Sequence, residues 1–163
     1  MLRLVDACPA LMPFRQAMLA DAATMAYNAP YFPPDGTLPF PPEKWDAWLA
    51  RWTGHEPERY CGYLLDGDTP VGEVCWHSLG EGMGVVIKAE YRGRGYGAQG
   101  LALLCARAFA HAQIAALVNT FESERDAALA MHLRAGFVPA GEQDGCLMLR
   151  LTREAYQTHT EGA

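Results

Sequence analysis

The spacing of hydrophobic residues predicts helices and strands along most of the chain. A strand is expected at 2–7, and a helix at 14–27, where apolar residues recur near the 3.6-residue period. The segment 31–42 is rich in proline and aromatic residues, so we expect an extended, turning connection there. A short second helix is predicted at 43–52.

The middle of the chain has the two-residue alternation of β-strands. Residues 59–68 and 69–79 alternate around a DGDTP turn, and residues 82–90 follow an SLGEG turn, which predicts a three-stranded antiparallel meander. After a glycine-rich stretch at 91–100, apolar residues recur on one face of a helix. These predicted core residues are Leu101, Leu104, Cys105, Ala108 and Phe109.

The hydrophobic pattern in the last third of the chain predicts a buried strand at 114–122 and a helix at 125–136 that ends at Gly136. A strand pair is expected at 137–143 and 144–152. The order of elements is therefore β, α, α, a β meander, α, β, α, β, β. This order predicts an α/β (α+β) fold with a mixed, largely antiparallel sheet and helices on both faces. At 163 residues, half of them hydrophobic, we expect one domain over 1–163.

The composition of the chain limits the classes of partner that we expect. No apolar run approaches the length of a membrane span, and the N-terminus lacks the pattern of a secretory signal, so we expect a cytoplasmic protein without a membrane partner. The formal charge of −6 argues against a nucleic-acid partner and favours a neutral or cationic substrate.

The cysteines predict neither a disulfide framework nor a metal site. Five are scattered along the chain without any CxxC pair, and we expect most of them to be small buried side chains. They are Cys8, Cys61, Cys75, Cys105 and Cys146.

The glycine-rich stretch YRGRGYGAQG is the strongest functional signal. Glycines between a strand and a helix let several backbone N–H groups converge on one anion, and the helix N-terminus adds positive charge. A P-loop is excluded because no GK precedes Ser or Thr. Gly95, Gly97 and Gly100 fit the dinucleotide pattern GxGxxG, with Glu122 about twenty residues further on, so spacing alone leaves that alternative open. Its context is unfavourable, because the preceding strand belongs to a meander.

A third pattern matches better. Arg92, Gly95 and Gly97 fit [QR]xxGx[GA], which resembles the pyrophosphate-binding motif of the GNAT superfamily of acetyl-CoA-dependent N-acetyltransferases. RDAALAMHLRAGFVPAG is similar to that family's next block, NxxAxxLYxxxGF, and the element order agrees over nearly the full length. The resemblance implies acetyl-CoA (coenzyme A) as cofactor, held by a loop and by a strand that splays from 114–122. The implied coenzyme contacts are Val85, Val86, Ile87, Arg92, Gly93, Arg94, Gly95, Tyr96 and Gly97.

The resemblance also implies catalytic residues. Glu81, eleven residues before Arg92, stands where several members carry a general base, although it could equally be a solvated turn residue. Glu73, His77 and Glu122 are alternatives. His132 stands five residues before Phe137, where a tyrosine general acid is usual, and Arg125 replaces the family asparagine. A charged imidazole could donate the proton, but a helical histidine can also be a packing residue.

An amine acceptor is expected near the aromatic connection and second helix, where rings could enclose a cation. The alternative for Trp45, Trp48 and Trp52 is core burial. We expect acceptor contacts from Tyr27, Tyr31, Phe32, Trp45, His77 and Glu122, with Phe40 nearby. The predicted reaction is direct acetyl transfer to a primary amine of a small molecule or peptide. A non-catalytic acyl-CoA sensor and a dinucleotide-binding module are the alternatives, and exposed C-terminal strands make a homodimer plausible.

Overall fold

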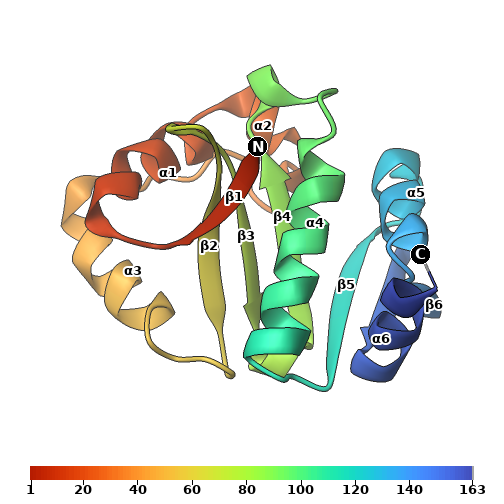
Figure 1. The fold of residues 1–163 in the computed structure, drawn as a ribbon. Coiled ribbons are helices and arrows are strands. Elements are labelled where there is room, and N and C mark those ends of the chain that lie inside the picture. Colours follow the sequence, from red (N-terminus) through yellow and green to blue (C-terminus); the bar gives the residue numbers. More distant parts are fainter. Residues whose placement is uncertain (163) are drawn as a thin grey trace.

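The computed structural model describes residues 1–162, so only the last residue of the expected domain 1–163 lies outside it. Its strands form two sheets (Figure 1). The first has the order β1-β2-β3-β4 and contains β1 (Leu2–Asp6), β2 (Tyr60–Asp66), β3 (Thr69–His77) and β4 (Gly82–Ile87). The second has the order β5-β7-β6 and contains β5 (Ala116–Glu122), β6 (Val138–Gln143) and β7 (Cys146–Thr152). Every pairing within the two sheets is antiparallel.

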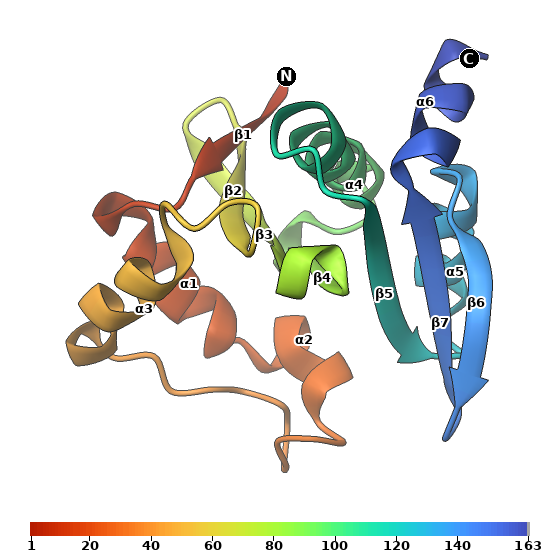
Figure 2. The same ribbon diagram turned by 90° about the horizontal axis from the view of Figure 1, so that it is seen from below.

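Helices cover both faces of the first sheet, as Figure 2 shows. One face carries α4, and the opposite face carries α1, α2 and α3, while α5 and α6 lie with the second sheet. Their bounds are α1 (Met12–Leu19), α2 (Ala22–Met25), α3 (Trp45–Trp52), α4 (Tyr96–Ala106), α5 (Asp126–Arg134) and α6 (Arg153–Glu161). None of the helices within residues 1–162 has the length and apolar character needed to cross a membrane.

Two hydrophobic cores follow from the alternation of side chains along the first sheet. Leu64 of β2 packs with Leu101 and Leu104 of α4 in the larger core, which also contains residues of the second sheet. Its neighbours Tyr63 and Leu65 point the other way and pack with residues of α1 and α3. Successive strand residues face opposite sides, so one strand serves both cores.

The helix predicted at 14–27 is interrupted in the structure. The chain leaves α1 at Ala20 and begins α2 after Asp21, whose backbone is extended. The side chain of Asp21 accepts a hydrogen bond from the Thr24 hydroxyl, which stabilises this new start. The apolar period continues through the break, so the pattern alone predicted one helix.

The C-terminal helix α6 was not predicted. Its residues, REAYQTHTE, include only two hydrophobic ones, Ala155 and Tyr156, which are too few to predict an apolar face. Thr152 caps the helix through a side-chain hydrogen bond from the backbone N–H of Ala155. In contrast, the predicted core face after the glycine-rich stretch is confirmed, because all five of its residues are buried.

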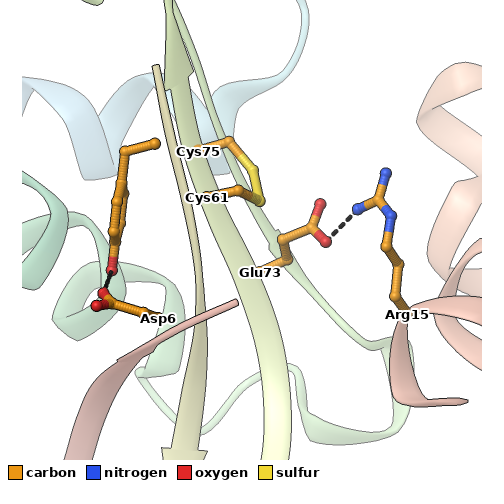
Figure 3. The surroundings of a disulfide bond; sticks show 6 residues. Asp6, Arg15, Cys61, Glu73 and Cys75 are labelled. Carbon is orange, nitrogen blue, oxygen red and sulfur yellow. Dashed lines mark hydrogen bonds and ion pairs between the residues drawn. A yellow bond between two sulfur atoms is a disulfide. The ribbon is translucent and has the colours of Figure 1, made fainter. Parts of the chain in front are cut away.

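The expectation of no disulfide is wrong. Cys61 and Cys75 lie directly opposite each other on β2 and β3 and form a disulfide (Figure 3). The hairpin brings together two cysteines that are 14 residues apart, and no CxxC spacing signals such a pair. Glu73 lies on the same side of β3 and pairs with Arg15 of α1.

Candidate functional site

A cleft of about 930 Å³ opens between β4 and β5. The two strands start close together, because a side chain at Gly80 would collide with the carbonyl group of Ala116. The two strands belong to separate sheets, and the cleft is lined by residues 83–87 of β4 and by residues 119–122 of β5. Within the described chain, β4 pairs only with β3, so the edge of β4 that faces the cleft keeps its backbone hydrogen-bonding groups available.

The glycine-rich loop borders this cleft and leads into α4. Gly93 and Gly95 have positive φ angles of 78° and 79°, which glycine adopts without the strain of a side chain. Among residues 1–162, no backbone carbonyl accepts from the N–H groups of residues 93–98. A Cβ atom at Gly93 would meet no other atom, so the loop surface is open. These unpaired donors at a helix N-terminus fit the pyrophosphate of coenzyme A.

The two arginines of the loop, both implied coenzyme contacts, have different surroundings. Arg92 lines the cleft, but its guanidinium donates to the carbonyl oxygens of Ala23, Thr24 and Ile87 at 3.1, 2.8 and 3.1 Å. Arg94 donates to the carbonyl of Glu90 and is not among the residues that line the cleft. The backbone of the loop, rather than its cationic side chains, therefore presents most of the free donors.

The predicted pantetheine strand lies along one wall of the cleft. Val85, Val86 and Ile87 are all half-buried lining residues, as are Tyr96 and Gly97 at the start of α4. The Tyr96 hydroxyl itself donates to Asp66 at 2.6 Å. The strand and the loop thus meet at one end of the cleft, as the sequence resemblance implies.

His132 of α5 is among the residues that line the cleft, yet only 1% of its surface is exposed. Nδ1 lies 2.8 Å from the carbonyl oxygen of Ala128, and Nε2 lies 3.0 Å from the amide nitrogen of Asn119. A proton on Nδ1 satisfies both contacts, because the carbonyl must accept and the amide must donate. The ring also packs against Phe121 and Phe137. Burial lowers the pKa of His132, which favours the neutral ring.

Aromatic and charged side chains form a second group in the cleft. The Tyr31 hydroxyl donates to Glu122 at 3.0 Å and lies 3.9 Å from the sulfur of Cys146. This hydrogen bond to the carboxylate raises the pKa of Tyr31 to about 12. Arg125 lies over the ring of Tyr27, with 5.2 Å from its Cζ to the ring centroid. Burial raises the pKa of Tyr27, with a further contribution from Glu73.

Several residues expected at the site lie elsewhere. Glu81 is exposed in the turn before β4, and His77 is exposed at the end of β3. Phe32 is exposed, whereas Trp45 packs in the smaller core and donates its indole N–H to the carbonyl of Phe40. None of these residues lines the cleft, and Trp48 also packs in the smaller core.

The structure adds Asn119 and Arg125 to the site. Asn119 is the first polar residue of β5, after three apolar ones, and this change along the strand could have drawn attention to it. Arg125 was noted in the sequence only as a departure from the asparagine of the family pattern. Both side chains line the cleft.

Comparisons with known proteins agree with this geometry. The family model described as "Acetyltransferase (GNAT) family" matches residues 21–137. No curated protein shows significant sequence similarity to the chain.

Solved structures share the fold at low sequence identity. The spermidine N-acetyltransferase from Vibrio cholerae in complex with CoA and spermine is 14% identical, with a TM-score of 0.78 over 96% of this chain and 98% of that one. Mutant forms of a spermidine/spermine N-acetyltransferase from Vibrio cholerae are 13% identical, with a TM-score of 0.75 over 98% and 99% of the two chains.

Proposed function

The chain belongs to the GNAT family of acetyltransferases, which use acetyl-CoA, and we propose that it moves the acetyl group directly to a primary amine of a small molecule or peptide. The observation that carries this proposal is the cleft between β4 and β5, which do not pair with each other, with the open N–H groups of residues 93–98 at its border. Acetyl-CoA would supply the acetyl group as an activated thioester. The loop would hold its pyrophosphate, and the free edge of β4 would pair with its pantetheine arm.

Acceptor activation is assigned to Glu122. Within the described chain it is the only carboxylate that lines the cleft, whereas Glu81 is exposed in a turn and Glu73 is paired with Arg15. As the amine nitrogen bonds to the acetyl carbon and the carbon–sulfur bond breaks, one proton must leave the nitrogen. Glu122 would accept that proton, directly or through water, while Tyr31 orients its carboxylate.

Asn119 and His132 are assigned to the thioester end. Because both ring nitrogens of His132 are already engaged, we propose that it is a positioning residue that orients the Asn119 amide. The second N–H of that amide has no partner within residues 1–162 and could donate to the reacting group. Protonation of the thiolate by His132, as expected from the sequence, is the alternative.

The positions and pairing of the cysteines support direct transfer of the acetyl group from acetyl-CoA to the amine. No cysteine is among the described residues that line the cleft, and Cys61 and Cys75 are paired. Burial raises the pKa of Cys105 to about 12, so that thiol is a poor nucleophile. A covalent acetyl-cysteine intermediate is therefore disfavoured.

The test is a thiol-release assay with acetyl-CoA and a panel of amines, combined with thermal unfolding in acetyl-CoA or NAD. We expect amine-dependent release of coenzyme A and a higher melting temperature with acetyl-CoA only. Stabilisation by acetyl-CoA without turnover of any amine would favour the sensor alternative. Stabilisation by NAD alone would favour the dinucleotide alternative.

A further inference from the structure

The charges in the cleft do not suit a polycation. Its charged lining residues within the described chain, leaving the neutral His132 aside, are Arg92, Glu122, Arg125 and Arg134. The guanidinium of Arg92 is hydrogen-bonded to backbone carbonyls. The carboxylate of Glu122 already accepts a hydrogen bond from the Tyr31 hydroxyl. An acceptor with several positive charges would therefore find one engaged carboxylate and two further arginines.

Arg125 packs against two aromatic rings and forms one long ion pair, with Glu122. Its guanidinium lies over the rings of Tyr27 and Phe121, at 5.2 and 5.6 Å from the two centroids. Its nearest acid is Glu122, at 3.8 Å, which is too long for a hydrogen bond. No side-chain hydrogen bond from Arg125 is present among residues 1–162, and 39% of the side chain is exposed.

Such an arginine suits a carboxylate. A guanidinium offers a planar fork that binds both oxygens of one carboxylate, and stacking on rings holds the fork in a fixed plane before the ligand arrives. Glu122 lies beside it, so a negative and a positive group are separated by a few ångströms. The ammonium and carboxylate of an α-amino acid have the complementary arrangement.

We propose that Arg125 binds a carboxylate of the acceptor, so that the substrate is a carboxylate-bearing amine of the amino-acid type rather than a polyamine. This inference rests on the proposed function, because it names the acceptor class of the same cleft. Arg125 and Glu122 would hold the two charged groups, and the rings of Tyr27 and Phe121 would flank them. The acceptor would thus differ from the polyamines named for the similar solved structures.

The first experiment compares the common α-amino acids with their amides, and with spermidine, in the thiol-release assay. We expect the free acids to be better acceptors than the matching amides, and spermidine to be poor. Arg125→Gln should raise KM for the acids by about 10- to 100-fold, as loss of a charged hydrogen-bonded contact does, with little change for the amides. Arg125→Lys should be intermediate, because it keeps the charge and loses the fork.

The matched control is Arg51→Gln, which removes the same charge from the exposed surface of α3. It should leave the preference for acids unchanged. Equal loss for acids and amides in Arg125→Gln, or a preference for spermidine, would overturn the inference. So would a loss of acetyl-CoA affinity alone, since Arg125 would then belong to the coenzyme site.

A second measurement does not depend on turnover. N-acetyl amino acids and their amides, the products of the two acceptor classes, are titrated by calorimetry into the wild-type and Arg125→Gln proteins. Tighter binding of the acids in the wild type only would support the carboxylate site even if no amine is acetylated and the proposed function fails. Equal binding of acids and amides would overturn the site even if the chain proves to be an acetyltransferase.

Discussion

Arg92 donates a hydrogen bond to the carbonyl oxygen of Thr24 at 2.8 Å, which ties the glycine-rich loop to helix α2. Thr24 also accepts from the backbone N–H of Ala89 through its hydroxyl, so two bonds join the same segments. Tyr27, which lines the cleft, follows closely along the chain. The loop that would hold the coenzyme and the segment that would cover the acceptor are therefore one connected unit.

The first prediction concerns this link. Arg92→Gln should lower the free energy of unfolding by about 1–2 kcal/mol, because three carbonyl oxygens lose a charged donor that is partly exposed to water. Urea unfolding measures this change, with Arg51→Gln as the control for loss of charge. Unchanged stability together with lost acetyl-CoA binding would show instead that Arg92 contacts the coenzyme directly.

The second prediction concerns the loop backbone. Gly95→Val should abolish stabilisation by acetyl-CoA, because the branched side chain would cover the N–H groups that open toward the cleft. Valine at a φ of 79° also strains the backbone, so stability needs its own control. Gly54 has a φ of 75°, meets no neighbouring atom and does not line the cleft. Gly54→Val should show similar strain with the coenzyme response intact, and a coenzyme response retained in Gly95→Val would rule out the cradle.

The third prediction concerns pH and His132. Burial lowers the pKa of the folded ring below its ordinary value of 6.5, so the unfolded chain binds more protons between the two values. The stabilising contribution is complete above pH 6.5 and is lost as pH falls through the folded pKa. Thermal melts from pH 7.5 to 5 should therefore show a loss of stability that is reduced in His132→Phe. A neutral ring at pH 7 does not serve as a general acid. If wild-type turnover declines on the alkaline side and this decline disappears in His132→Phe, His132 is a general acid after all.

The fourth prediction concerns the general base. Glu122→Gln should lower kcat by roughly 100- to 10,000-fold, while acetyl-CoA still binds. The amide oxygen of glutamine can still accept from Tyr31, so the local packing is retained. Steady-state rates from pH 5 to 9 test this, with Glu81→Gln measured in parallel. If Glu81→Gln carries the larger loss, the assignment from the sequence resemblance holds and ours is wrong.

The strands and the family were predictable because each depends on local pattern. The alternation in 59–68 and 69–79 requires only that neighbouring side chains face opposite sides, and the motif from Arg92 to Gly97 is contiguous. The break at Asp21 was not predictable, because the hydrophobic period continues through it. Helix α6 was missed since it is held by a cap and a few contacts rather than by an apolar face.

The site was harder to predict, because its residues meet only in three dimensions. Arg125 meets Tyr27 across nearly a hundred residues, and His132 meets Asn119 from a different element. The motif places Arg92 in the glycine-rich loop beside the cleft, but nothing local reveals that its side chain turns toward Thr24. Trp45 illustrates the opposite error, because this ring, expected at the acceptor site, packs instead against the smaller core.

The unpaired edge of β4 has a consequence for handling the protein. An open strand edge is a template on which another extended chain can pair, and proteins commonly protect such edges against aggregation. If the pantetheine arm occupies this edge, the ligand-free protein exposes an adhesive surface that the loaded protein conceals. Light scattering at high protein concentration should then rise more slowly in the presence of coenzyme A, beyond any effect of the higher melting temperature.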